Sequence, residues 1–181
     1  VFSAAEKGFI SATHENLQCL KSLSAHFSKN CVRTLDRGFD ANDYYRYFLK
    51  NDEKFVIRSK KNSNVIYNGK TQNIMDVAGK YKGNYRMNFK DKHGKKIECK
   101  ISYIPVRLCE FPNKALVLVA VYGFGVQPML LLTNLGVSEK KKLCMIATKV
   151  YLMQWRIEEY FKFKKQQFEL EDLRVMSLQS I

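Results

Sequence analysis

The sequence predicts an α/β fold, and the order of its helical and strand patterns is the main reason. Helices and strands alternate over the first 58 residues, strands and turns fill residues 59–135, and a helical period returns at Ser138. Such alternation favours a sheet with some parallel strands, because a helix usually connects parallel neighbours. With 181 residues, 46% of them hydrophobic, the chain fits one domain, or one domain with an insertion, around a buried core.

The N-terminal part is predicted to hold two helices and two strands. Leucines at three-residue steps predict a helix over residues 12–28, and a short strand follows over residues 31–35. A second helix, residues 41–49, is rich in tyrosine and comes directly after Asp40, which is predicted to cap it. Residues 55–58 then form the next strand.

The middle of the chain is predicted to form five to seven strands, with a hairpin turn at Gly69-Lys70. The predicted strands include residues 65–68, 85–89, 96–106, 115–122 and 129–134. From Ser138 to about Phe168 apolar residues recur at steps of three and four, which indicates one apolar face of a long helix.

Charge narrows the class of partner. The 31 lysines and arginines exceed the 17 acids by 14, which favours a polyanion such as nucleic acid; the alternative is a basic protein from a lysine-rich proteome. No apolar run approaches the roughly 18 residues of a membrane helix. Five cysteines without CxxC spacing argue against a zinc site or a disulfide framework and favour a reducing cytosol. The first residue is Val1, so a fragment or a processed product is expected.

A first candidate site directly follows the predicted strand at residues 31–35. Asp36 stands at the strand's carboxyl end, with Arg37 and Gly38 after it. Functional groups gather at such strand ends in open α/β sheets. Asp-x-Gly is also ordinary turn chemistry, so this segment alone fits a simple turn as well.

A second candidate site lies on the predicted C-terminal helix. One side of that helix, at steps of three and four residues, carries Tyr151, Gln154, Glu158, Lys162 and Lys165. A carboxylate on this stripe can point into a cleft, with cations one and two turns further on. The alternative is a surface helix with ordinary Glu–Lys pairs.

Together, the two segments resemble the motifs of IS4-type DDE transposases. That family has Asp-Arg-Gly-aromatic after a strand and, much later, Tyr, two residues, Arg, three residues, Glu, six residues, Lys. Tyr151, Glu158 and Lys165 stand at these spacings, whereas Gln154 occupies the position of the arginine. Residues 1–9 and 131–135 also resemble stretches of the family.

The resemblance implies an RNase H-like (ribonuclease H/integrase-type) core that a β-rich insertion interrupts. Residues 1–60 would then be part of the core, residues 61–135 the insertion, and residues 136–181 the core helix that carries the glutamate. The 122 residues between Asp36 and Glu158, with predicted strands among them, fit this layout.

The resemblance also implies the chemistry. Such enzymes hold two divalent cations, Mg²⁺ or Mn²⁺, with three carboxylates, and they cut DNA and transfer strands at the ends of an insertion element. By motif match Asp36 is the second acid and Glu158 the third, both metal ligands. Residues 1–35 contain no Asp, so the first acid is expected upstream of Val1, and this chain alone is expected to be inactive.

DNA contacts are predicted for Lys162 and Lys165, beside the scissile phosphate, and for Arg37. Tyr151 is expected to stack on a base or to pack in the core. Three other basic clusters, residues 58–61, 90–96 and 140–142, are predicted to be solvated surface, with phosphate contact as the alternative.

The expected partner is double-stranded DNA, at element ends and at the target, with a homodimer as one arrangement for holding two ends. The expected location is the cytoplasm of a bacterium or archaeon, at the nucleoid. A second hypothesis is a non-catalytic DNA-binding module from a decayed or domesticated transposase, which Gln154 and the missing first Asp favour. A third, a β-rich domain that binds no nucleic acid, fits poorly with the charge of +14.

Overall fold

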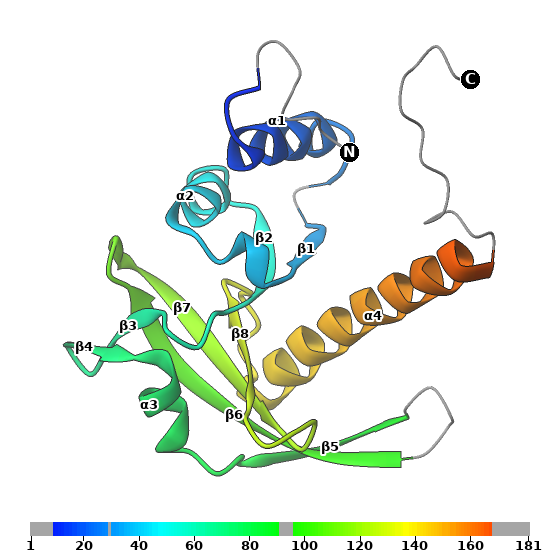
Figure 1. Ribbon diagram of the computed structural model, residues 1–181. Helices are drawn as coiled ribbons and strands as arrows, with labels where there is room; N and C mark the ends of the chain where they lie inside the picture. The colour runs from blue at the N-terminus through cyan, green and yellow to red at the C-terminus, as the bar shows by residue number, and fades with distance from the viewer. Residues whose placement is uncertain (1–8, 29, 91–95, 168–181) are drawn as a thin grey trace, which may run out of the picture.

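The computed structural model describes residues 9–28, 30–90 and 96–167, which form one sheet with helices on both faces (Figure 1). The helices are α1 (Ala12–Ser24), the 3-10 helix η1 (Arg37–Phe39), α2 (Asn42–Lys50), α3 (Ile74–Gly79) and α4 (Lys140–Gln167). The strands are β1 (Val32–Leu35), β2 (Lys54–Arg58), β3 (Asn64–Tyr67), β4 (Lys70–Asn73), β5 (Tyr85–Lys90), β6 (Lys96–Leu108), β7 (Phe111–Tyr122) and β8 (Met129–Thr133).

The eight strands form one continuous sheet in the order β1-β2-β8-β7-β6-β3-β4, with β5 paired to β6 outside this path. β1 and β2 are parallel, and the remaining pairs are antiparallel. This confirms the predicted α/β class with some parallel strands. β8 pairs with both β2 and β7, so the sheet continues from the N-terminal strands into the strand-rich middle of the chain.

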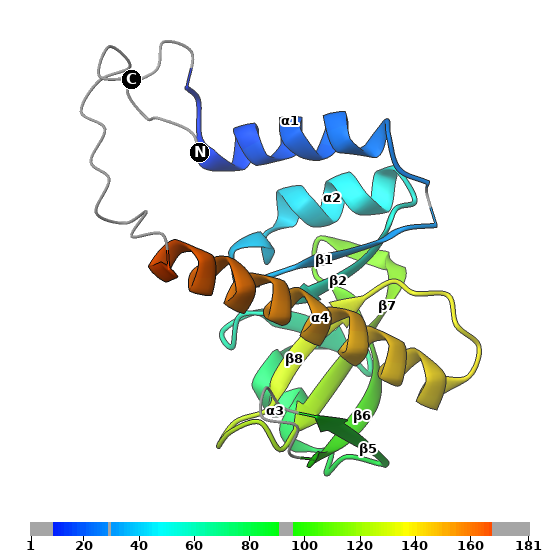
Figure 2. The same cartoon turned by 90° about the vertical axis from the view of Figure 1, so that its right-hand side faces the viewer.

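Each face of the sheet buries its own core. Period-two alternation divides the strands: in β2, Phe55 and Ile57 face the first core and Val56 faces the second. The first core lies under α1, α2 and α3, and the second lies under α4, which crosses the sheet as one long helix (Figure 2). Among the described residues, no helix is both long enough and apolar enough to cross a membrane.

The predicted elements agree with the structure at the β3–β4 hairpin and differ from it at helix α3. The predicted β3–β4 hairpin is confirmed, but its turn residues are Asn68 and Gly69, one residue before the predicted Gly69-Lys70, because both have positive φ, 49° and 77°. Helix α3 was not predicted within the strand-rich region. It has only six residues, too few for a helical period, and begins where Asn73 Oδ1 accepts the amide of Met75 at 2.8 Å.

The first helix is shorter than predicted. It ends at Ser24, and the following residues turn towards β1. Phe27, which was expected to extend the apolar stripe, is 52% exposed and lies under the guanidinium of Arg33, 5.5 Å from the ring centre. Because the Phe27 ring contacts Arg33 and does not pack in the core, it adds no buried apolar contact that would extend α1 beyond Ser24.

Candidate active site

Asp36 stands where β1 ends, as the N-cap of the 3-10 helix η1. Its Oδ1 accepts the amide of Gly38 at 2.8 Å, and a Cβ at Gly38 would lie only 3.0 Å from that oxygen. Asp36 is exposed, and it accepts no other hydrogen bond from the residues that the structure describes. Its carboxylate therefore keeps lone pairs available for a cation.

An open cavity of about 820 Å³ lies beside Asp36. Its walls come from the carboxyl ends of β1 and β2, the loop between β7 and β8, and the middle of α4. The lining residues are Asp36, Arg37, Arg58, Lys61, Phe124, Gly125, Val126, Gln127, Pro128, Met129, Tyr151 and Leu152. The two sequence motifs, 115 residues apart between Asp36 and Tyr151, thus meet at one cavity.

Tyr151 fixes this part of α4 against the sheet. It is 8% exposed and packs in the second core, in the same cluster as Val56 of β2 and Leu131 of β8. Glu158 follows seven residues later on α4, which is about two turns or roughly 10 Å along the helix axis. The backbone of Glu158, Lys162 and Lys165 belongs to α4, but their side chains lie outside the described part of the structure.

Cations outnumber acids among the described residues that line the cavity. Arg37, Arg58 and Lys61 are the cations there, and Asp36 is the acid. None of the three forms an ion pair with an acid that the structure describes, whereas Arg33, Arg46 and Arg86 do. Because cations gathered in a cleft raise the local concentration of anions, the cavity suits a phosphate.

Arg58 and Lys61 were predicted to be solvated surface, with phosphate contact as the alternative. Both line the cavity, where Arg58 is half-buried and Lys61 is exposed. A signal for Arg58 was present in the sequence. β1 and β2 are parallel with Leu35 level with Ile57, so the next residues, Asp36 and Arg58, reach the same edge of the sheet. Carboxyl ends of parallel strands meet in this way whenever a helix connects them.

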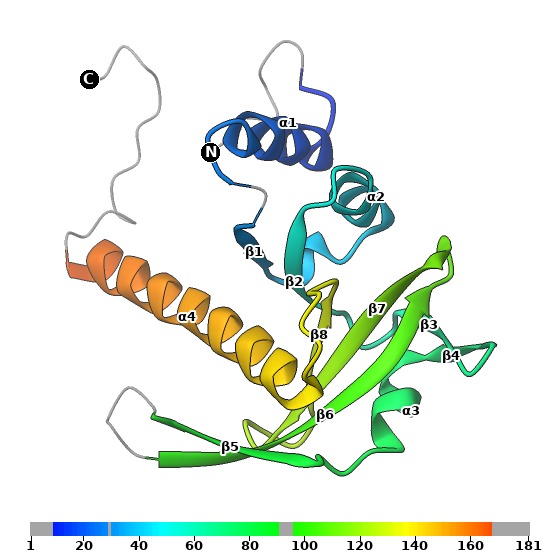
Figure 3. The ribbon, with the colours of Figure 1, turned by 180° about the vertical axis from the view of Figure 1, so that it is seen from behind.

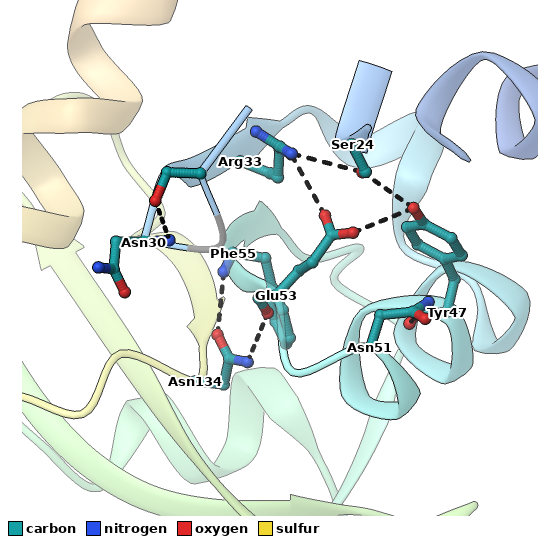
Figure 4. A network of polar contacts seen from close by, with 9 residues as sticks. Ser24, Asn30, Arg33, Tyr47, Asn51, Glu53, Phe55 and Asn134 are labelled. Carbon is teal, nitrogen blue, oxygen red and sulfur yellow. Dashed lines mark hydrogen bonds and ion pairs between the residues drawn. The ribbon is translucent and has the colours of Figure 1, made fainter. Parts of the chain in front are cut away.

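A polar network holds β1 in place upstream of the cavity. Figure 4 shows Arg33 of β1 reaching Glu53 at the start of β2, with Nε 3.3 Å from Oε2. Tyr47 of α2 donates to Glu53 Oε1 at 3.1 Å, and its hydroxyl lies 2.9 Å from Ser24 Oγ at the end of α1. The Arg33 and Glu53 side chains are only 15% and 7% exposed, so loss of either would leave a poorly solvated charge.

Asn134 completes this network from the other side. Its amide nitrogen donates to the backbone carbonyl of Glu53 and its amide oxygen accepts the backbone N–H of Phe55, both at 2.9 Å (Figure 4). Asn134 follows β8 directly, so these bonds join the end of β8 to the start of β2. The strands that flank the cavity are thereby fixed relative to one another.

Metal ligands are incomplete among the described residues, which contain no group of three His, Cys, Asp or Glu side chains that could hold an ion. Comparison with known families adds the decisive observation. The sequence model of the family described as Transposase DDE domain matches residues 10–181. The chain belongs to this family.

Membership of this family indicates the general function of the transposase DDE domain. The family implies a nuclease and transposase activity with DNA as substrate, and it generally uses divalent metal ions. The match includes the Asp36 turn, the cavity and the whole of α4. No curated protein matched the chain.

Proposed function

We propose that this chain carries the second aspartate and the glutamate of an IS4-type DDE active site. In this proposal the full-length protein cuts DNA at the ends of an insertion element and joins the 3′-hydroxyl to target DNA. The main support is the cavity shared by Asp36 of β1 and Tyr151 of α4, the helix that carries Glu158. Parallel β1 and β2 with α4 across them fit an RNase H-like core, in which residues 61–135 are the β-rich insertion.

Asp36 and Glu158 are the proposed metal ligands. Carboxylate oxygens are hard donors, which suit Mg²⁺ and Mn²⁺, and the Asp36 carboxylate has an exposed position with lone pairs available. When bound, two such ions activate the attacking water or 3′-hydroxyl and stabilise the leaving oxygen. A first aspartate from outside residues 1–35, which contain none, completes the ligand set.

The cations of the cavity hold the DNA backbone in this proposal. Arg37, Arg58 and Lys61 line the same cavity as Asp36, where a phosphodiester must lie to be cut. Tyr151 is largely buried, so its main contribution is to fix α4, with its exposed edge towards the DNA. Lys162 and Lys165 follow one and two turns after Glu158 and contact phosphate beside the scissile bond.

The proposal is tested by nicking of supercoiled plasmid by the full-length protein in Mn²⁺. We expect Glu158→Gln to abolish nicking, because an amide is a much weaker ligand for a hard cation than a carboxylate. Glu139→Gln is the matched control: it makes the same change at an exposed residue just before α4 and leaves nicking intact. Equal activity of Glu158→Gln and Glu139→Gln would refute the assignment.

A second candidate function is a DNA-binding module without catalysis, from a decayed or domesticated transposase. Gln154, half-buried on α4, favours it, since the IS4-type pattern has an arginine there. Full-length protein that binds DNA tightly but nicks none in Mn²⁺ or Mg²⁺ would establish this alternative. Higher nicking activity in Gln154→Arg would instead show an active site that is weakened by glutamine at the position of the arginine.

A further inference from the structure

The turn that follows β2 carries one cation of the cavity. Residues 60–63 form this turn, in which the amide of Ser63 donates to the carbonyl of Lys60 at 3.3 Å. Lys61 occupies the second position of the turn, is exposed and lines the cavity. Arg58, in contrast, belongs to β2 and is paired in the strand ladder with β8. The position of Lys61 therefore depends on the contacts that hold the turn.

Asp40 bonds to this turn on both sides of Lys61. Its Oδ2 accepts the amide of Lys60 at 2.5 Å and the hydroxyl of Ser63 at 2.7 Å, and its backbone carbonyl accepts Lys60 Nζ at 3.1 Å. The carboxylate is itself oriented, because Tyr45 Oη donates to its Oδ1 at 2.6 Å. One buried side chain thus holds the two ends of the turn.

Asp40 also belongs to the segment that carries Asp36 and Arg37. Its amide donates to the carbonyl of Arg37 at 3.3 Å, at the end of the 3-10 helix η1 that Asp36 caps. Asp36 and Arg37 line the same cavity as Lys61. The carboxylate of Asp40 therefore joins two walls of the cavity that follow different strands.

Strand pairing does not reach far enough to make this connection. β1 and β2 lie side by side (Figure 3), but their pairing ends at Leu35 and Ile57. Past that point, every hydrogen bond that the structure describes between residues 36–40 and residues 59–63 involves Asp40.

Two backbone hydrogen bonds hold the flanks of the turn to other elements. The Ser59 amide donates to the Leu130 carbonyl of β8, and the Ile74 amide of α3 donates to the Ser63 carbonyl, both at 2.9 Å. Neither bond involves the η1 segment. They keep the turn at the sheet, whereas Asp40 sets its place relative to the η1 segment.

We propose that Asp40 is a positioning residue for DNA binding, which holds Lys61 so that its ammonium group meets the phosphate beside Asp36. The inference rests on the proposed function, which puts that phosphate in the cavity. A turn that is already ordered loses less conformational entropy when its lysine contacts a phosphate, so the contact contributes more to affinity. Loosening the turn should thus weaken duplex binding without changing the chemistry at Asp36 and Glu158.

The test is duplex DNA binding by the full-length protein with Ser63→Ala, with Lys61→Gln and with both changes. Ser63→Ala removes one hydrogen bond to Asp40 and no charge, and we expect it to lower affinity about two- to threefold. Because this loss acts through Lys61, the double variant should bind as Lys61→Gln does alone. The rate of plasmid nicking at saturating DNA should stay at the wild-type value in Ser63→Ala.

Ser11→Ala is the matched control for Ser63→Ala. Ser11 is also a half-buried serine, and its hydroxyl accepts one hydrogen bond, from the amide of His14 at 3.1 Å at the start of α1. Its replacement should leave duplex affinity unchanged.

Asp40→Asn is a second variant, for which charge and position predict opposite results. It removes a negative charge near the cavity, which by electrostatic attraction alone would strengthen DNA binding. An asparagine has one carbonyl oxygen, which cannot replace both carboxylate oxygens as acceptors. We therefore expect affinity to fall about two- to fivefold and the slope of log affinity against log salt to shrink by about 1. Asp43→Asn, the same change at an exposed ion pair with Arg46, should not lower affinity.

Losses of affinity that multiply in the Ser63/Lys61 double variant would show a general effect on the fold and would overturn the proposal. Higher affinity in Asp40→Asn, or wild-type affinity in Lys61→Gln, would also overturn it. None of these results touches the assignment of the metal ligands, which fails only if Glu158→Gln still nicks plasmid DNA.

Discussion

Two aspartates, Asp36 and Asp40, lie four residues apart in one short segment and have opposite surroundings. Asp36 is exposed at the cavity and accepts one hydrogen bond from the described residues, from Gly38. Asp40 is 8% exposed: its Oδ1 accepts Tyr45 Oη at 2.6 Å, and its Oδ2 accepts the Lys60 amide at 2.5 Å and Ser63 Oγ at 2.7 Å. The difference shows how one residue type keeps an open carboxylate at one position and holds the fold together at the other.

The two carboxylates differ in how many hydrogen bonds their oxygen lone pairs accept. Asp40 joins the segment before α2 to the turn after β2, and three donors occupy its oxygens. Such a carboxylate stabilises the fold and has little capacity left for a cation. The Asp36 carboxylate, in contrast, is exposed to solvent in the cavity that Arg37, Arg58 and Lys61 also line.

The largest effect is expected for Asp36→Asn. Nicking by the full-length protein should fall about 1,000-fold or more, as when a residue of a catalytic unit is removed. The asparagine oxygen can still accept the Gly38 amide, so the free energy of unfolding should stay within about 0.5 kcal/mol of the wild type. Plasmid nicking and urea unfolding measure the two quantities, and substantial remaining activity would remove Asp36 from the site.

Asp40→Ala should act on stability instead. It leaves the Tyr45 hydroxyl, the Lys60 amide and the Ser63 hydroxyl without their acceptor, which is expected to cost about 3 kcal/mol of unfolding free energy. The matched control is Asp43→Ala, at an exposed ion pair with Arg46, where the loss should stay below about 1 kcal/mol. Equal losses of unfolding free energy in Asp40→Ala and Asp43→Ala, measured by urea unfolding, would contradict the stabilising role of Asp40.

Tyr45→Phe should have a smaller and pH-dependent effect, about 1 kcal/mol near neutral pH. Burial first, and the Asp40 carboxylate second, raise the pKa of Tyr45 well above its usual 10.0. The unfolded chain therefore loses this proton near pH 10 while the folded chain keeps it. The resulting stabilisation is complete below about pH 10 and decreases as the pH rises further.

Urea midpoints between about pH 9 and about pH 11 test this directly. The wild type should lose more stability over that interval than Tyr45→Phe, which has no phenol at this position to titrate. Parallel curves for the two proteins would show that the pKa of Tyr45 is not raised in the folded protein.

Neighbouring lysines give the smallest expected effect. Lys61 lines the cavity, whereas Lys60 donates from Nζ to the backbone carbonyl of Asp40 at 3.1 Å. Lys61→Gln should lower duplex DNA affinity about two- to fivefold and the salt slope by about 1, because one phosphate contact is lost. Lys60→Gln should leave that slope unchanged. A larger loss of affinity in Lys60→Gln than in Lys61→Gln, measured by binding titration, would show that the DNA does not contact the cavity.

Local patterns were enough to predict most elements. The apolar run of β2, the β3–β4 hairpin and the apolar period of α4 each depend on neighbours in the sequence, and each of these elements is present as predicted. The prediction that Asp40 caps α2 was wrong. Ala41 is the N-cap residue, and Asp40 is drawn to the turn after β2 by donors about 20 residues away.

The sequence by itself determined the order of the elements, the Asp36 turn and the helix that bears Glu158, because these depend on spacing along the chain. Only the tertiary structure decided that Arg58 and Lys61 line the same cavity as Asp36, that Tyr151 fixes α4 beside it, and that Asp40 accepts three hydrogen bonds. It also decided that the β5–β6 pairing extends past β7. These outcomes depend on strand register and on packing between distant segments, which no local pattern contains.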